Sequence, residues 1–138
     1  MLMRLWTIGV KVTDLDRELV FHRQVGHDII LDEAVTVNER AFRIVLMRMG
    51  DKYLHLFEEA VYEDQLAEPL APGPCHIVYI SEDFEQDIVD LQSAGAQHLF
   101  PLTTIKAGFG QRRVAFFRSP GGMIFEVIRV LENLVPEV

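Results

Sequence analysis

Apolar and polar positions alternate along several short stretches of the chain, and two longer stretches carry apolar residues at helical spacing. The alternating and β-branched stretches predict strands at residues 5–12, 29–37, 41–49 and 52–58, and again at 76–80, 97–103, 112–118 and 123–130. The helical spacing, stopped each time by a glycine, predicts helices at residues 14–25 and 83–94. Each half of the chain therefore has the predicted order β-α-β-β-β.

The second half repeats the first. A shift of 69 positions (76 − 7) places Thr7 over His76 and stays in step along the following strand and helix. A shift of 71 positions (126 − 55) places His55 over Glu126 near the end of each half. We place the two extra residues in the glycine-containing stretch 106–110, where a loop can absorb them. Two copies predict a closed pair of modules, because a solenoid needs three or more repeats.

The repeat predicts a single domain made of two modules. Module one spans about residues 4–60 and module two residues 74–131. The linker between them, residues 61–73, contains Pro69, Pro72 and Gly73, which are typical of irregular connections. The predicted fold class is therefore α+β.

The composition limits which classes of partner the protein can bind and indicates its compartment. The formal net charge of −8 argues against binding nucleic acid or an anionic membrane through a basic surface. The single Cys75 cannot form an intramolecular disulfide, which fits a reducing compartment. No long uncharged apolar run or signal-peptide pattern is present. We expect a cytoplasmic protein whose partner is a small molecule, with no nucleic acid or membrane partner.

Four polar residues stand at equivalent positions of the two halves, Thr7 with His76 and His55 with Glu126. Equivalent positions of two symmetric modules would face a common cleft. A carboxylate inside the apolar run around Glu126 needs a partner or a metal. Two histidines and one carboxylate are a typical ligand set for a divalent metal, with open positions for water or substrate.

Several segments resemble the vicinal oxygen chelate superfamily, which includes glyoxalases, methylmalonyl-CoA epimerases, extradiol dioxygenases and bleomycin resistance proteins. The segments are Thr7-Ile-Gly-Val-Lys-Val-Thr-Asp-Leu-Asp, Leu54-His55-Leu56-Phe57-Glu58, His76-Ile-Val-Tyr-Ile and Ser119-Pro-Gly-Gly-Met-Ile-Phe-Glu126. The resemblance covers nearly the whole chain. It implies two tandem β-α-β-β-β modules that close a U-shaped mixed sheet around a cleft, and a homodimer.

The resemblance also implies a ligand set on the first and last strands of each module. Carried over by position, the metal ligands are His55, His76 and Glu126, and Glu126 is in addition the candidate catalytic residue. Thr7 stands where the superfamily most often has His or Gln. His55 compensates for that replacement and keeps the count of two histidines and one carboxylate. One divalent ion, Zn, Fe, Mn, Ni or Co, would occupy the site.

The resemblance implies two classes of function. The first is a small metal-dependent enzyme acting on a substrate with adjacent oxygens, of isomerase, epimerase or lyase type, with a dioxygenase as a further option. The second is a metal-free ligand-binding protein of the bleomycin-resistance type, which Thr7 suits better than a four-ligand site. In either case the predicted pocket residues are Thr7, Met47, Tyr53, Phe57, Phe109 and Phe116.

Plainer interpretations of the same residues stay open at this stage. His76 at the start of a strand suits a hydrogen-bonded core histidine, and His55 suits the lining of an apolar cleft without metal. Glu126 suits a structural salt bridge to an arginine of the neighbouring strand: Arg112, Arg113 or Arg118.

Overall fold

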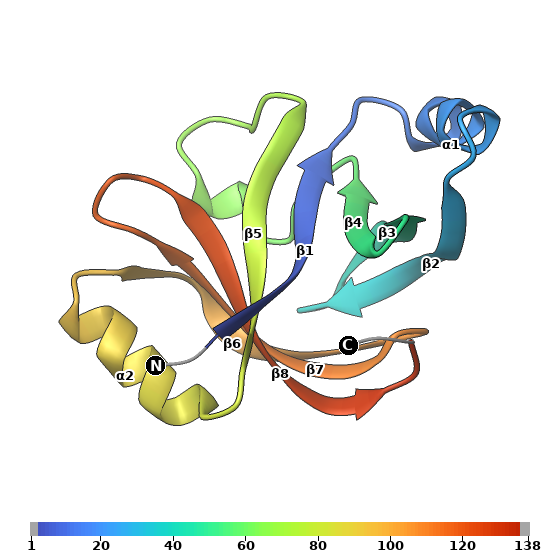
Figure 1. The fold of residues 1–138 in the computed structure, drawn as a ribbon. Helices are drawn as coiled ribbons and strands as arrows, with labels where there is room; N and C mark the ends of the chain where they lie inside the picture. The colour runs from blue at the N-terminus through green and yellow to red at the C-terminus, as the bar shows by residue number, and fades with distance from the viewer. Residues whose placement is uncertain (1–2, 136–138) are drawn as a thin grey trace. The chain divides into compact units, whose positions relative to one another are not determined.

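The structure is a computed structural model that describes residues 3–135. Its elements follow the predicted order twice (Figure 1). They are β1 (Met3–Lys11), α1 (Leu15–Gln24), β2 (Asp28–Val37), β3 (Arg40–Met49), β4 (Lys52–Phe57), a short 3-10 helix η1 (Glu63–Gln65), β5 (Gly73–Ser81), α2 (Phe84–Ser93), β6 (Gln97–Ala107), β7 (Gly110–Arg118) and β8 (Ile124–Asn133). The α+β class and the duplicated β-α-β-β-β order are therefore confirmed.

The chain forms two compact units. One is residues 7–75, called here the N-terminal unit, and the other is residues 3–6 with 76–135, called the C-terminal unit. The strand β1 is thus divided, because its first residues belong to the C-terminal unit and the rest to the N-terminal unit. Within residues 3–135 no helix has both the length and the apolar content needed to span a bilayer.

The sheet of the N-terminal unit has the strand order β2-β3-β4-β1. The pairs β2/β3 and β3/β4 are antiparallel, whereas β1 runs parallel to β4 with Thr7 opposite Tyr53. Helix α1 covers one face of this sheet, because its buried residues Leu15 and Leu19 pack in one apolar cluster with residues of β3 and β4.

Helix α1 is held at both ends. At its start, the Asp14 carboxylate accepts a hydrogen bond from the N–H of Arg17 at 3.1 Å, as an N-cap residue does. The Glu58 carboxylate, just after β4, accepts a second bond from the N–H of Leu15 at 2.9 Å. The helix ends before Gly26, whose φ of +89° suits glycine at the position after the C-cap. The predicted glycine stop is confirmed.

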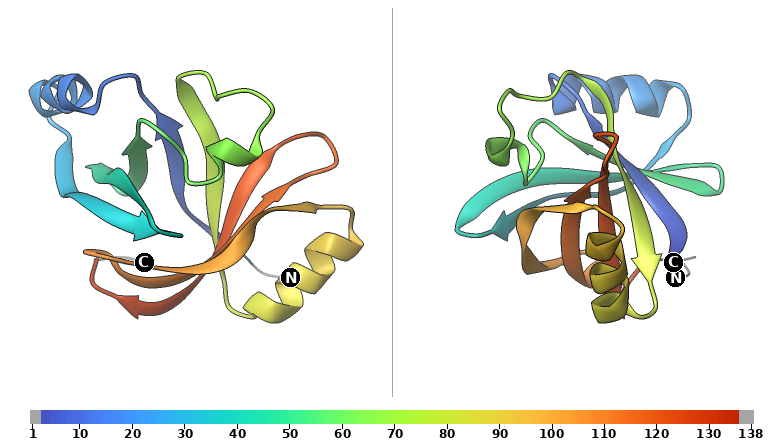
Figure 2. Two further views of the ribbon diagram at one scale, coloured as in Figure 1. Left: turned by 180° about the vertical axis from the view of Figure 1, so that it is seen from behind. Right: turned by 90° about the vertical axis from the view of Figure 1, so that its left-hand side faces the viewer.

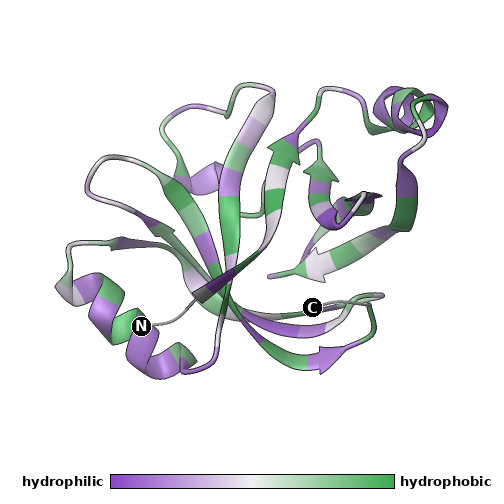
Figure 3. Cartoon of the chain, in the orientation of Figure 1, coloured by the Kyte–Doolittle hydropathy of each residue, from purple (hydrophilic) through white to green (hydrophobic). Residues whose placement is uncertain are grey.

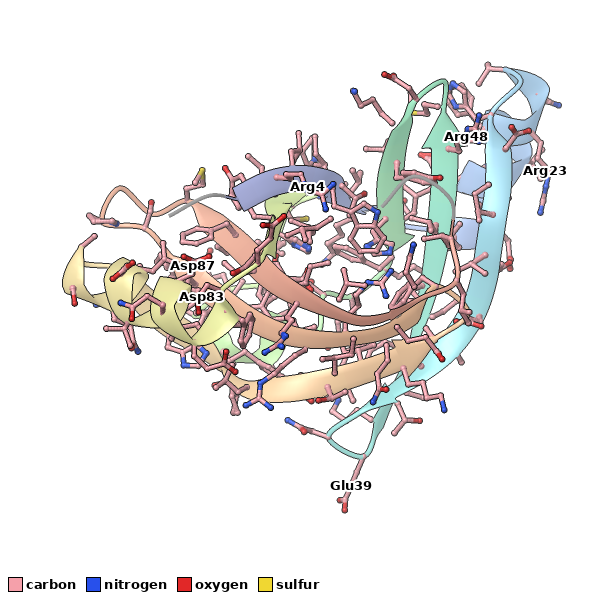
Figure 4. All side chains as sticks on the ribbon, turned by 60° about the horizontal axis from the view of Figure 1, so that its bottom comes forward. Arg4, Arg23, Glu39, Arg48, Asp83 and Asp87 are labelled. Carbon is pink, nitrogen blue, oxygen red and sulfur yellow. The ribbon has the colours of Figure 1, made fainter. Side chains whose placement is uncertain are left out.

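The β2–β3 hairpin turns through two residues. Asn38 and Glu39 have φ values of +50° and +67°, which is the backbone of a type I′ turn. Figure 4 shows Glu39 at the tip of this hairpin, with its side chain pointing away from the strands. The sequence predicted a turn over 38–40, and the loop is one residue shorter because β3 already begins at Arg40.

The sheet of the C-terminal unit has the order β5-β8-β7-β6, with β5 parallel to β8 and the other pairs antiparallel. Helix α2 lies against one face of it (Figure 2). Phe84 of the helix packs there with Phe117 of β7 and Phe125 of β8. Coloured by hydropathy, α2 shows both apolar and polar residues along its length, as expected of a helix with one buried face (Figure 3).

The last strand is longer than predicted, because β8 continues to Asn133. Arg112 of β7 stabilises this extension. Only 1% of the surface of Arg112 is exposed. Its guanidinium donates hydrogen bonds to the backbone oxygen of Glu132 and to Oδ1 of Asn133, the latter at 2.9 Å. Neighbouring Gly110 has no room for a side chain, since a Cβ there would lie 2.1 Å from the same Glu132 oxygen. The predicted loop at 106–110 is therefore a tight hairpin.

Candidate functional site

His76 and Glu126 come together on neighbouring parallel strands, β5 and β8. The Nε2 atom of His76 lies 3.5 Å from Oε2 of Glu126. Both residues are buried, with 6% and 8% of their surfaces exposed. The partner that the buried carboxylate requires is therefore an imidazole, whereas Arg112 is engaged with the C-terminal extension and Arg113 lies over the Phe84 ring.

The surroundings of this pair are apolar. The ring of Phe116, the residue opposite Glu126 on β7, meets the His76 ring edge to face with 5.7 Å between their centres. Ile124 and Ile128, two positions before and after Glu126, are buried as well. Because side chains alternate along a strand, these residues share the sheet face opposite to that covered by α2. Water is largely excluded here, so electrostatic interactions of the carboxylate are stronger than at the surface.

The geometry of the pair fits two ligands of one metal ion. Nitrogen and oxygen ligands lie about 2.0–2.2 Å from a bound zinc ion, and tetrahedral angles then place two ligand atoms about 3.4 Å apart. The 3.5 Å between the His76 nitrogen and the Glu126 oxygen matches that separation. In the described part of the C-terminal unit, no third His, Cys, Asp or Glu side chain joins the pair to form a group of three. The pair alone would supply only two of the ligands that such an ion needs.

Thr7 has a structural partner of its own. Its hydroxyl donates a hydrogen bond of 2.7 Å to the backbone oxygen of Tyr53, and the residue is fully buried. This bond joins the two strands at the position where they pair. The hydroxyl hydrogen is thus committed to the β1–β4 ladder, which explains why a threonine is stable at a buried position of this strand.

The side chains of β4 alternate between a face towards α1 and the opposite face. Leu54 and Leu56 point towards α1, because both pack in its apolar cluster. Tyr53, His55 and Phe57 therefore share the opposite face of the strand. Tyr53 and Phe57 are buried and His55 is partly exposed. The role of His55 as a metal ligand stays a prediction of the sequence.

Met47 was predicted to line the pocket, but it lies elsewhere. It is fully buried in the α1 cluster with Leu15 and Leu19. The reason is the strand register, which pairs Met47 with Leu54 and so places it on the helix side of the sheet. Leu46, paired with His55, occupies the face on which Met47 was expected.

Phe116 and Phe109, both predicted to line the pocket, have different surroundings. Phe116 contacts the His76 ring, so it lies beside the candidate site. Phe109 lies in the β6–β7 turn, where its ring meets the edge of Trp6 at 5.9 Å between centres and one face of the Arg112 guanidinium. The packing seen for Phe109 therefore supports the C-terminal extension.

Sequence reasoning missed a buried ion pair in the N-terminal unit. Lys11 of β1 pairs with Glu63 of η1, and their side chains are only 14% and 8% exposed. The Glu63 carboxylate also accepts a hydrogen bond from the N–H of Ala60 at 3.2 Å. Lys11 lies four residues after Thr7 on the same strand, hence on the same face. That parity was the available signal, because a lysine on a buried strand face requires an anionic partner.

No protein-family model matches the sequence, and a search of curated proteins finds no match either. Solved structures do match along nearly all of the chain. A variant of methylmalonyl-CoA epimerase from Streptomyces coelicolor, in complex with 2-nitronate-propionyl-CoA, is 23% identical with a TM-score of 0.72, covering 96% of this chain and 100% of that chain. The methylmalonyl-CoA epimerase from Mycobacterium tuberculosis is 19% identical with a TM-score of 0.66, covering 93% and 88%.

A variant of 4-hydroxymandelate synthase from Streptomyces coelicolor is also similar, at 17% identity and a TM-score of 0.62. The match covers 93% of this chain and 48% of that chain. These enzymes are members of the vicinal oxygen chelate superfamily. At such identities the likeness shows the fold, and the chain therefore has the glyoxalase-like fold that its sequence segments predicted.

Proposed function

We propose that the chain is a metal-dependent enzyme of isomerase or epimerase type that acts on a small substrate with adjacent oxygens. The observation that carries the proposal is the buried pair of His76 and Glu126, whose donor atoms lie 3.5 Å apart. A neutral imidazole and a carboxylate are common ligands of borderline divalent metals. The sequence repeat supports His55 as a third ligand.

When bound, a divalent ion would supply Lewis acidity that stabilises an enolate-like charge on the substrate. The chain contributes the rest. His76 and Glu126 would hold the ion, and the packing of Phe116 against His76 fixes the orientation of the imidazole. Glu126 would also face the reacting centre, and it is therefore the proposed catalytic carboxylate. Glu58 is committed to the first turn of α1 and is no candidate for a proton-transferring base.

The ligands of similar structures support one substrate class for a first test. A structure of methylmalonyl-CoA epimerase with methylmalonyl-CoA is 23% identical to this chain with a TM-score of 0.71. An acyl thioester with a second carbonyl group on the α-carbon carries the adjacent oxygens and the acidic proton that the proposed chemistry needs. We therefore take methylmalonyl-CoA as the first substrate to test. The dioxygenase option has weaker support, because the Thr7 hydroxyl is bonded to Tyr53 where that class usually has a histidine.

The metal-free ligand-binding protein is the second candidate. The observation that favours it is the same bond from Thr7 to the Tyr53 oxygen, which gives this residue a purely structural role. In that case the His76–Glu126 contact has a structural role, and the aromatic side chains around it form an apolar binding surface.

Metal analysis of the purified protein tests the two candidates. About one equivalent of a divalent metal is expected, and it should be lost in His76→Ala and in Glu126→Gln. His98→Ala is the matched control, because His98 lies on the exposed part of β6. A wild-type protein that takes up no more metal than His76→Ala after incubation with Mn, Fe, Co, Ni or Zn would overturn the enzyme proposal and leave the ligand-binding protein.

Proton exchange tests the reaction class. The metal-loaded protein is incubated with methylmalonyl-CoA in deuterated water, and loss of the α-proton signal is followed by NMR. Exchange that depends on His76 and Glu126 supports the epimerase type. A metal-loaded protein that exchanges neither this proton nor those of related thioesters and 2-oxo compounds would remove the isomerase class. The proposed homodimer is tested in the same preparation by sedimentation.

A further inference from the structure

Two histidines face each other at the end of α1, outside the candidate site described above. His22 lies in the last turn of the helix and His27 follows Gly26. The N–H of His27 donates a hydrogen bond of 3.0 Å to the backbone oxygen of His22, which fixes the turn. The two Nδ1 atoms then lie 3.0 Å apart, with ring centres separated by 5.2 Å and ring planes inclined at 31°.

The two Nδ1 atoms share one hydrogen, and moving that hydrogen to Nε2 of its own ring would leave a lone pair on each Nδ1 for a cation. At 3.0 Å one of the two Nδ1 atoms carries a hydrogen and the other accepts it. The Glu18 carboxylate lies 4.0 Å from Nε2 of His22 and favours a proton on that nitrogen. Nδ1 of His22 is then the acceptor and His27 the donor. Histidines that bind metals commonly have such a carboxylate behind the second ring nitrogen.

The distance between the two Nδ1 atoms also favours one class of metal. Bonds of about 2.0–2.1 Å from two nitrogens that are 3.0 Å apart enclose an angle of about 90° at the ion. That angle suits the tetragonal geometry of Cu²⁺ and Ni²⁺ better than the tetrahedral geometry of zinc. The His22 side chain is 14% exposed and His27 is partly exposed, so water can reach the pair and fill the remaining positions.

The fold itself does not require two imidazoles at this place. In the second module Leu91 and Ala96 stand at the equivalent positions (22 + 69 and 27 + 69), and they pack in the apolar cluster under α2. The helix therefore ends in the same way without them. Burial is the main cause that lowers the pKa of His22.

We propose that His22 and His27 form a two-histidine chelate for Cu²⁺ or Ni²⁺, separate from the candidate site at His76 and Glu126. The ion replaces the hydrogen between the two Nδ1 atoms. The displaced proton of His27 moves to its own Nε2, so no proton has to leave the pair. In residues 3–135 no third His, Cys, Asp or Glu completes a group of three here, and water supplies the other ligands.

The test uses the full chain with the other site removed, as His76→Ala with Glu126→Gln. Calorimetric titration of this protein with Ni²⁺ should give one binding event. Adding His27→Gln should weaken the affinity at least tenfold, and so should His22→Gln. Adding His98→Gln, at a histidine outside the pair, should leave it unchanged. Equal affinities in the His27→Gln and His98→Gln proteins would overturn the proposal. Circular dichroism confirms that each variant is folded.

A second measurement uses the wild-type protein and does not depend on any variant. Substoichiometric Cu²⁺ should broaden amide NMR signals of residues 18–28 beyond detection, because a paramagnetic ion acts on nearby nuclei. Broadening that spares residues 18–28 would overturn the chelate whatever the candidate site at His76 does. If broadening appears here while the metal analysis of His76→Ala equals that of the wild type, the chelate stands and the proposed enzyme site fails.

Discussion

The guanidinium of Arg112 lies over the ring of Trp6, with its carbon 5.1 Å from the ring centre. The ring of Phe109 also lies against the guanidinium, at 5.0 Å. Cations gain attraction from aromatic faces, and more so when water is excluded. The chain has a single tryptophan, so its fluorescence reports directly on this contact.

Replacing Arg112 by methionine should lower the free energy of unfolding by about 1–3 kcal/mol, because the backbone oxygen of Glu132 and the side chain of Asn133 lose their donors. The tryptophan emission of the folded protein should shift at the same time. Urea unfolding followed by fluorescence measures both effects. Arg113→Met on the exposed side of the same strand is the control. Equal losses in the two variants would contradict this account.

Replacing Thr7 by valine keeps the shape of the side chain and removes its hydroxyl. The Tyr53 oxygen then loses a buried hydrogen bond, which should cost about 1–3 kcal/mol of stability. Thr7→Ser retains the donor and should cost less. Both variants should keep the metal content of the wild type, because the proposed ligands are elsewhere. A Thr7→Val protein that folds normally and loses its metal would make Thr7 a ligand after all.

Glycine at position 39 should stabilise the β2–β3 hairpin. Glu39 has a φ of +67°, a left-handed conformation that costs a residue with a side chain about 1–2 kcal/mol. The greater freedom of glycine in the unfolded chain offsets part of this, about 0.5–1 kcal/mol. We expect Glu39→Gly to raise the free energy of unfolding by about 0.5–1 kcal/mol in urea titrations. Glu39→Ala keeps the strain and should show no gain.

The ion pair between Asp32 and Arg43 should make stability depend on acid pH. Two hydrogen bonds of 2.9 Å from the guanidinium hold the pKa of Asp32 below its ordinary value of 3.8. A lowered folded-state pKa means that the stabilisation is present above about pH 3.8 and is lost as the pH falls through the folded-state value.

For this partly exposed pair, Asp32→Asn should cost about 0.5–1 kcal/mol at pH 7. The difference between the two proteins should shrink towards pH 2. Thermal unfolding at a series of pH values measures it, with the exposed Asp28→Asn of the same strand as control. A difference that stays constant from pH 7 to pH 2 would show that the carboxylate charge is not its cause.

The parts of the fold that follow local rules could be predicted. Strand faces have a period of two, so the shared face of Tyr53, His55 and Phe57 followed from the sequence alone. Gly26 marked the end of its helix because a left-handed backbone position favours glycine. The internal repeat predicted the candidate site residues, because it aligns Thr7 with His76 and His55 with Glu126.

The parts that depend on contacts between distant segments were missed. Met47 was assigned to the wrong face because the sequence does not tell which residue of β4 it pairs with. The partner of Lys11 is 52 positions away in a segment that looked like plain linker. The last strand was predicted to end at residue 130, because its extension depends on Arg112, which is 20 residues before Glu132.

The divided strand β1 has a consequence for synthesis on the ribosome. Residues 7–75 emerge early and contain all the strands of their own sheet, so this unit can fold while the chain is still growing. Residues 3–6 emerge even earlier, yet the segments they pack with are made only after residue 75. Trp6 leaves the ribosome more than a hundred residues before Phe109 and Arg112, which cover it. Residues 3–6 thus stay without these contacts until the segment around residues 109–112 has been made.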